Sequence, residues 1–200
     1  TLNGGDGNDS LEGGDGDDRL SGNDDNATLL GGDGDDRLVG GEGDDSLSGG
    51  DGQDTLEGGI GNDDLTDSSG QGGLLDGGED ADTITGNRFS SDTLVGGEGD
   101  DLISLISSSS STSDSVDAGI GNDTIDARNS VNDTINGGTG NDTLILSGDR
   151  ATYTISGDAL GVNVGVTASG VIDRLFGIEF IQFDDITLDL YSGVVGIVVY

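Results

Sequence analysis

The chain has 200 residues, 41 of them glycine, and 41 acidic residues against six basic ones give a formal net charge of -35. This charge argues against nucleic acid as a partner, because nucleic-acid binding depends on basic side chains that neutralise phosphates. Histidine and cysteine are absent, which excludes Ser-His-Asp and Cys-His catalysis, disulfides, and zinc sites built from nitrogen and sulfur. No apolar run is long enough for a membrane-spanning helix, so we expect no membrane insertion.

A nine-residue pattern, G-G-x-G-x-D-x-U-x with U aliphatic, starts at Gly4 and continues in about fifteen units to Ile145. Such a composition is also compatible with disorder, but disorder does not require a periodic ladder of single apolar residues. The pattern therefore predicts a solenoid of stacked coils. Its U position falls on Leu11, Leu20, Leu29, Leu38, Leu47, Leu56, Leu65, Leu74, Ile84, Leu94, Ile103, Val116, Ile125, Ile135 and Leu144.

Each unit divides into a turn and a short strand. Glycines at places one, two and four allow positive φ angles and leave backbone carbonyl oxygens free to converge. The x-U-x ending suits a strand of about three residues with one side chain inward and its neighbours outward. Stacking such strands about 4.8 Å apart builds parallel sheets on either side of a thin aliphatic core. The sequence therefore predicts an all-β fold, a parallel β-roll over residues 1–145.

The sixth place of ten units carries an aspartate. Carboxylates stacked about 4.8 Å apart would repel by roughly 3 kcal/mol per neighbouring pair at an effective dielectric constant near 20. Ligands that are only carboxylate and carbonyl oxygens favour Ca²⁺, whose flexible coordination suits a site built largely from backbone. The pattern therefore predicts calcium bound along the turns. The ten aspartates are Asp9, Asp18, Asp36, Asp45, Asp54, Asp63, Asp82, Asp101, Asp123 and Asp142.

This nonapeptide resembles the calcium-binding repeat of the RTX (hemolysin-type) family. The resemblance implies that two units form one coil and that ions lie between turns two units apart on the same edge. It implies ligation by the carbonyls at places two and four and the aspartate of one turn, and by the carbonyls at places one and three and the aspartate of the next. Gly32, Gly34 and Asp36 would then face Gly49, Asp51 and Asp54. The carbonyl ligands implied in this way include Gly32, Gly34, Gly41, Gly43, Gly49, Gly50, Asp51, Gly52, Gly58, Gly59, Ile60, Gly61, Gly97, Gly99, Gly119, Gly121, Gly138 and Gly140.

From unit eight onward, the degenerate units all have the same parity. After residue 66 the even-numbered units lose the glycine frame and carry the extra residues, whereas the odd-numbered units largely keep it. With two units per coil, we expect about five ions on the edge of the odd units and about two on the other, about seven in all. Asp114 and Asp133, at the sixth place of degenerate units, are expected to be turn or strand-edge residues. Ala27 at the sixth place of unit three should weaken the edge of the odd units.

The composition changes after Ile145, because most of the aromatic residues lie beyond it. Alternating residues at 151–156 and 161–167 predict longer strands. Residues 175–185 resemble the closing segment found after many RTX arrays, and an open solenoid end needs such a cover. We expect a C-terminal β cap over 146–190. The apolar tail 191–200 is a strand or, as the resemblance implies, part of a secretion signal.

These observations predict a calcium-binding module rather than an enzyme, with no catalytic residues. The resemblance implies that it folds on Ca²⁺ outside the cell as a switch and carrier for a larger secreted or bacterial cell-surface protein. The implied partners are the type I secretion apparatus and an upstream domain of the same protein. Two alternatives stay open: a polysaccharide-recognition module, as in mannuronan epimerases, or the C-terminal part of a secreted RTX protease or lipase.

Overall fold

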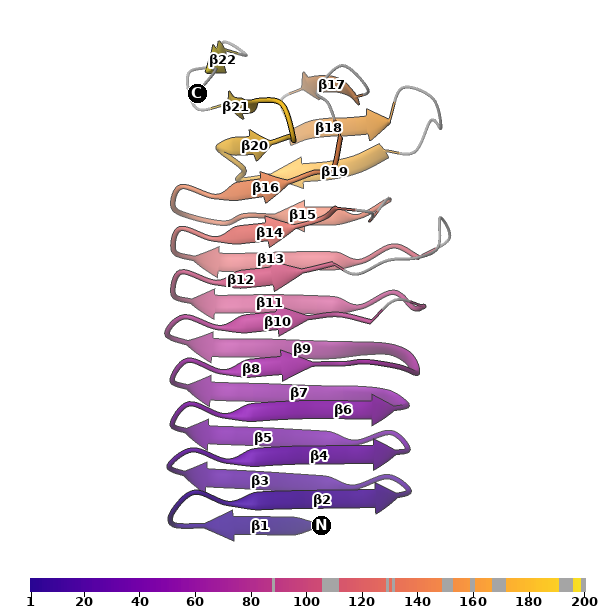
Figure 1. Ribbon diagram of the computed structural model, residues 1–200, viewed down its shortest axis with the longest axis vertical. Coiled ribbons are helices and arrows are strands. Elements are labelled where there is room, and N and C mark those ends of the chain that lie inside the picture. The colour runs from indigo at the N-terminus through magenta and orange to yellow at the C-terminus, as the bar shows by residue number, and fades with distance from the viewer. Residues whose placement is uncertain are drawn as a thin grey trace.

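Stacked β-strands make up all the regular structure in the described part of the chain (Figure 1). The computed structural model describes residues 1–87, 89–105, 112–128, 130, 132–148, 153–158, 161–166, 172–190 and 196–198. Over these ranges the chain forms a parallel β-solenoid of about seven turns, which confirms the predicted fold class. Within them, no helix has the length and apolar character needed to cross a membrane.

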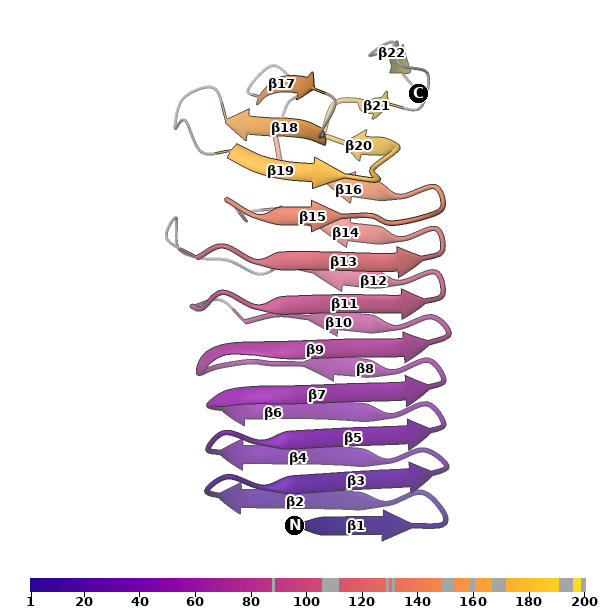
Figure 2. The same ribbon diagram turned by 180° about the vertical axis from the view of Figure 1, so that it is seen from behind.

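Two 11-stranded sheets lie one behind the other, and consecutive strands from β1 to β16 alternate between them (Figure 2). The first sheet contains, in spatial order, β1 (Leu2–Gly5), β3 (Arg19–Asp24), β5 (Arg37–Glu42), β7 (Gln53–Ile60), β9 (Gln71–Glu79), β11 (Thr93–Glu98), β13 (Ser115–Ile120), β15 (Thr134–Asn136), β19 (Ile172–Phe176), β18 (Gly161–Val166) and β17 (Tyr153–Asp158). The second contains β2 (Ser10–Asp15), β4 (Thr28–Asp33), β6 (Ser46–Asp51), β8 (Asp64–Thr66), β10 (Thr83–Thr85), β12 (Leu102–Ser104), β14 (Thr124–Asp126), β16 (Thr143–Ile145), β20 (Phe180–Gln182), β21 (Thr187–Asp189) and β22 (Gly196–Val198).

The aliphatic U residues form the core between the sheets. Leu20 pairs with Leu38 and Leu38 with Leu56, while Leu29 pairs with Leu47 in the other sheet. Each partner lies 18 residues further along the chain, so two nonapeptides form one coil. All five of these leucines are at most 2% exposed. A strand of this size has too little apolar area to be stable alone, so the stack stabilises its coils collectively.

Unit eight departs from the predicted register. Leu75 pairs with Leu56 and with Leu94 and is fully buried, whereas Leu74 is 39% exposed. Leu75 follows Leu65 by ten residues instead of nine. Because side chains alternate along a strand, one additional residue in the preceding turn exchanges the inward and outward positions. The prediction that Leu74 is the core residue of this unit was therefore wrong.

The two edges of the roll differ in the length of their turns. We call the edge with Asp45, Asp63, Asp82, Asp101, Asp123 and Asp142 the odd edge, and the edge with Asp18, Asp36 and Asp54 the even edge. From Leu75 onward, each turn of the odd edge keeps a nine-residue spacing between core residues, as from Ile135 to Leu144. The turns of the even edge have ten or more, as from Ile103 to Val116. Figure 1 shows the odd edge as the regular row of turns on the left.

Parallel pairing continues beyond the last nonapeptide. Strand β19 pairs with β15 and places Leu175 opposite Ile135, and β20 pairs with β16 and places Ile181 opposite Leu144. Strands β18 and β17 then add to β19 in antiparallel order, and β21 and β22 add to β20 in the same way. The role of residues 146–190 as a cap stays a prediction. Of the predicted tail, only the backbone of β22 lies within the described residues.

Candidate metal-binding edges

A ladder of buried aspartates runs along the odd edge. The backbone N–H of Asp45 donates to Oδ1 of Asp63 at 2.7 Å, and the N–H of Asp63 donates to Oδ1 of Asp82 at 2.8 Å. The same bond recurs at each further coil as far as Asp142. Each carboxylate therefore uses one oxygen to bind the coil before it.

The second oxygen, Oδ2, of the sixth-place carboxylates on both edges is buried and has no hydrogen-bond partner among the described residues. Leaving a buried carboxylate oxygen without a partner costs free energy. The same atom is left unpaired at the same place of nine turns, which indicates a shared ligand rather than isolated defects. The nine atoms are Oδ2 of Asp9, Asp36, Asp45, Asp54, Asp63, Asp82, Asp101, Asp123 and Asp142.

Carbonyl oxygens at places two and four point from one turn to the next turn of the same edge. The Gly41 carbonyl oxygen would lie within 3.0 Å of a Cβ atom built on Gly59, and the Gly43 oxygen within 3.0 Å of one on Gly61. Gly59 and Gly61 have φ angles of 125° and 129°, which residues with side chains rarely adopt. Glycine is therefore required both by the turn and by the close approach of the preceding carbonyl.

Carbonyl oxygens at places one and three point the opposite way, toward the preceding turn. The Gly58 oxygen would lie within 3.0 Å of a Cβ atom on Gly40. The Ile60 oxygen accepts the N–H of Gly43 at 2.7 Å. Oxygens of two successive turns therefore converge on one gap, in the arrangement that the RTX resemblance implies. That the atoms bind calcium in these pairs stays a prediction.

Burial and crowding raise the pKa values of the ladder carboxylates. Burial is the largest cause, and neighbouring carboxylates add to it, so the pKa of Asp63 and of Asp82 is about 7. The pKa of Asp101 and of Asp142 is about 6 for the same reasons. Their ionised forms therefore lack compensating charge within the described protein. A donor set of carboxylate and carbonyl oxygens with uncompensated negative charge fits Ca²⁺.

Backbone oxygens dominate this donor set. Among the described residues, no three carboxylates lie close enough together to hold a metal ion. Each gap instead combines the carboxylates of two turns with the carbonyls around them. Ile60 illustrates this, because it occupies a place that offers only its carbonyl to the gap.

The even edge starts in the same way as the odd edge. The N–H of Asp18 donates to Oδ1 of Asp36 at 2.7 Å, and the N–H of Asp36 donates to Oδ1 of Asp54 at 2.9 Å. Asp36 and Asp54 both have an unpaired buried Oδ2. This half of the even edge therefore offers the same groups as the odd edge.

The ladder of the even edge continues beyond residue 66 with a different chemistry. The N–H of Asp92 donates to Oδ1 of Asp114, and the N–H of Asp114 donates to Oδ1 of Asp133, each at 2.9 Å. Here protein groups also occupy second oxygens: the Asn87 N–H donates to Oδ2 of Asp92 at 2.7 Å, and the Ser130 hydroxyl to Oδ2 of Asp133 at 2.6 Å. These carboxylates are held by the protein itself.

This geometry supports two expectations and adds to one of them. Asp114 and Asp133 directly precede strands β13 and β15, as expected for strand-edge residues. They are also 3% and 1% exposed and belong to the ladder. Sequence reasoning judged them by their missing glycines and could not see the amides they accept. The hypothesis that the even edge beyond residue 66 lacks calcium is supported by Asp92 and Asp133, whose second carboxylate oxygens already accept protein donors.

Unit three retains its turn without two of its glycines. Asn23 and Asp25 adopt φ angles of 78° and 67°, a region that asparagine and aspartate enter more readily than other side chains. Ala27 stands at the ligand place, and its N–H donates to Oδ1 of Asp45 at 2.6 Å. The unit therefore keeps the backbone of the ladder and lacks the carboxylate, consistent with the weaker site expected there.

Two carboxylates at the edges were not among the predicted ligands. Asp67 is 1% exposed with an unpaired Oδ1, and burial raises its pKa to about 7. Its position two residues after Leu65 matches place one of the other units, which a glycine usually occupies. Glu179 accepts the N–H of Asp142 through Oε2 at 2.9 Å. No repeat pattern marks it, because it follows the last nonapeptide.

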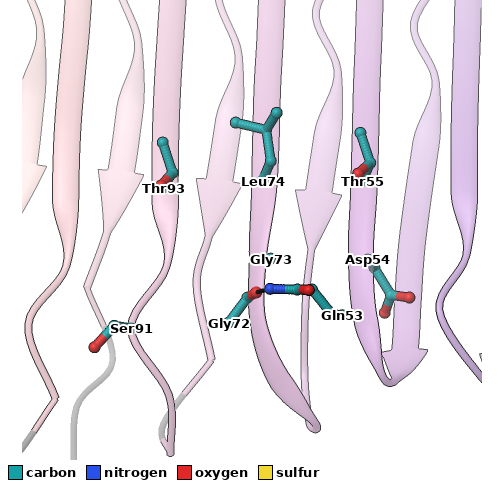
Figure 3. A pocket seen from close by; sticks show the side chains of 8 residues that line it. All are labelled: Gln53, Asp54, Thr55, Gly72, Gly73, Leu74, Ser91 and Thr93. Carbon is teal, nitrogen blue, oxygen red and sulfur yellow. Dashed lines mark hydrogen bonds between the residues drawn. The ribbon is translucent and has the colours of Figure 1, made fainter.

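A polar depression of about 390 Å³ lies on the even edge beside unit eight (Figure 3). The Gln53 side-chain amide crosses it and donates to the Gly72 carbonyl at 3.1 Å. Among the described residues that line the depression, Asp54 is the one ionisable side chain.

Comparison with protein families agrees with the geometry. The RTX calcium-binding nonapeptide repeat (4 copies) matches residues 1–29, 30–65, 74–91, 89–104, 109–144 and 128–150, which together cover more than half of the chain. No curated protein matches the chain as a whole. The matched ranges contain all ten predicted aspartate ligands, and the roll has the architecture expected for such repeats. The chain therefore belongs to the family of RTX calcium-binding nonapeptide repeat proteins.

Proposed function

We propose that this chain is a folding switch and carrier, which becomes ordered when it binds calcium outside the cell. The observation that carries the proposal is the row of buried, unpaired Oδ2 atoms. Several of them lie next to the place-one carbonyl of the following turn, as Oδ2 of Asp45 lies next to the carbonyl of Gly58. Without a cation between them, the ionised carboxylates of successive turns repel one another. The RTX repeat itself binds calcium, so the ligand follows from the family.

The chain's own residues would hold the ion in a defined way. Asp45 and Asp63 would contribute one carboxylate each, and the carbonyls of Gly41 and Gly43 would face those of Gly58 and Ile60 across the gap. When bound, Ca²⁺ supplies the positive charge that stabilises these carboxylates in their ionised form. We propose about seven such sites, five on the odd edge and two on the even edge.

Linkage then couples calcium to folding. A ligand that binds only the folded form stabilises it by about 2.7 kcal/mol per site at a hundredfold excess over Kd. With a net charge of -35, the chain is expected to be expanded where calcium is scarce. Low cytosolic calcium would keep it export-competent, and abundant extracellular calcium would fold it.

Export is the second part of the proposal. RTX repeat proteins are typically secreted by type I secretion, and we propose the same route, with the secretion apparatus and an upstream domain as partners. The module would then act at the cell surface or in the medium. The RTX β-roll is a structural, non-catalytic fold. We propose that any catalytic activity of the parent protein lies in another domain.

The switch is tested by circular dichroism on protein cleared of calcium with a chelator. We expect a spectrum without sheet signal in the absence of calcium and a cooperative gain of β signal at millimolar Ca²⁺, with Mg²⁺ at the same concentration as the control. Small-angle scattering on the same samples should show compaction. A complete sheet signal without calcium would contradict the proposed switch.

A further inference from the structure

We propose that Glu179 completes an additional calcium site, which ties the strands after the repeats to the last turn of the odd edge. The inference rests on the proposed function and extends it to a residue outside the nonapeptides. It assigns to Glu179 the part that an aspartate takes in the preceding turns of that edge, apart from the turn with Ala27.

The first observation is the hydrogen bond that ends the ladder. The N–H of Asp123 donates to Oδ1 of Asp142 at 2.9 Å, and the N–H of Asp142 donates to Oε2 of Glu179 at the same distance. Glu179 thus continues the series by one coil, with a carboxylate in the same relation to the turn before it.

The second observation is a set of backbone oxygens at the same gap. The Gly177 carbonyl points back toward Gly137, where it would lie within 3.0 Å of a Cβ atom. The Gly138 carbonyl oxygen would likewise lie within 3.0 Å of a Cβ atom on Gly177, which has a φ angle of 57°. The pairing of β15 with β19 places Gly177 one coil above Gly137. The two carbonyls therefore have the orientations of places one and two in the complete turns.

The third observation is an unpaired atom aimed into this gap. Asp142 is completely buried, and its Oδ2 has no partner among the described residues. It lies beside Gly137, next to the Gly177 carbonyl. If Glu179 served only to accept the Asp142 amide, this oxygen would remain without compensation.

The final turn is shorter than the complete turns but keeps the position of the carboxylate. Gly137 precedes the core residue Leu144 by seven residues, whereas Gly177 precedes its counterpart Ile181 by only four. Glu179 nevertheless lies two residues before Ile181, as Asp142 lies two residues before Leu144. From this position its Oε2 accepts the Asp142 N–H.

The chemistry of the gap suits a divalent cation. Two carboxylates and two carbonyls supply oxygen ligands and two negative charges, and water would complete the six to eight ligands that Ca²⁺ takes. The shortened turn offers fewer backbone oxygens than a complete one. We therefore expect this site to bind calcium more weakly than the sites between complete turns.

The site is tested by counting bound ions with native mass spectrometry and calcium titration calorimetry on the full chain. Glu179→Gln removes the charge but keeps a side-chain oxygen that can accept the Asp142 N–H. We expect this variant to bind one ion fewer than the wild type. Glu12→Gln is the matched control, because Glu12 is exposed on strand β2, outside the turns, and it should bind the full number.

A second variant keeps the test decisive if the first one loses its fold. Glu179→Ala removes the carboxylate altogether, so it should also bind one ion fewer. The ion count is taken from whichever variant keeps the wild-type circular dichroism spectrum at saturating calcium. An unchanged ion count in that variant would overturn the role of Glu179 and leave the proposed function intact. A wild-type chain that binds no calcium would overturn the proposed function itself.

Discussion

The backbone N–H of Asp123 donates a 2.9 Å hydrogen bond to Oδ1 of Asp142 while Oδ2 of Asp142 remains unpaired. On the opposite edge Asp92 accepts protein donors at both carboxylate oxygens, from Gly73 and from Asn87. The backbone ladder is therefore the same on both edges, and the second oxygen decides which turns remain available to a cation.

Replacing one aspartate on each edge should separate calcium binding from folding. Asp123→Ala and Asp114→Ala each remove the acceptor of a buried amide, that of Asp101 and that of Asp92, and should each destabilise the fold by about 1 to 3 kcal/mol. Asp123→Ala alone should reduce the number of bound ions. Thermal unfolding and calcium titration calorimetry measure the two effects. Equal losses of calcium would contradict the assignment.

The pH dependence of stability should reveal the buried charge of Asp114. Burial raises the pKa of Asp114 from 3.8 to about 7, with Asp133 and Asp92 adding to it. A carboxyl group with a raised folded-state pKa contributes stability that is lost as the pH rises from about 4 through 7. Asp114→Asn keeps a side-chain oxygen and removes this charge. At pH 8 it should be more stable than the wild type by on the order of 2 kcal/mol.

The comparison of Asp114→Asn with the wild type is made at several pH values in saturating calcium. Near pH 4 and below, the wild-type carboxyl group is largely protonated in both the folded and the unfolded chain, so the two chains should unfold at similar denaturant concentrations. The difference should grow between about pH 4 and 7 and then level off. A difference that does not change with pH would show that Asp114 does not titrate in this range.

Alanine substitutions at two glycines with positive φ angles should separate the free-energy cost of backbone strain from the cost of crowding between coils. Gly59 has a φ angle of 125° and lies against the Gly41 carbonyl, whereas Gly5 has a φ angle of 105° and would have no atom within 4 Å of an added Cβ. Gly5→Ala should cost about 1 to 2 kcal/mol, from strain alone. Gly59→Ala should cost clearly more and raise the calcium concentration at the folding midpoint. Similar unfolding free energies would show that the Gly41 carbonyl moves aside freely.

The nonapeptide pattern predicted the roll and its two sheets because one inward residue per unit leaves little choice of register. It failed at Leu74, where one inserted residue shifted the inward position to Leu75. Such a shift cannot be read from a stretch in which both residues are leucine. The pattern also could not identify the ladder position of Asp114 or the reach of Glu179, because both depend on amides one coil away.

The constant turn length of the odd edge has a consequence for how such a chain can vary. Every change in coil length from Leu65 to Leu144 falls on the even edge, where the ladder is held by protein groups such as Asn87 and Ser130. Insertions there leave the core spacing of the opposite turns unaltered. The molecule thus combines an odd edge of constant turn length, where calcium is proposed to bind, with an even edge that accommodates turns of different length. Surface loops can lengthen on the even edge without changing the core spacing at the proposed ion sites.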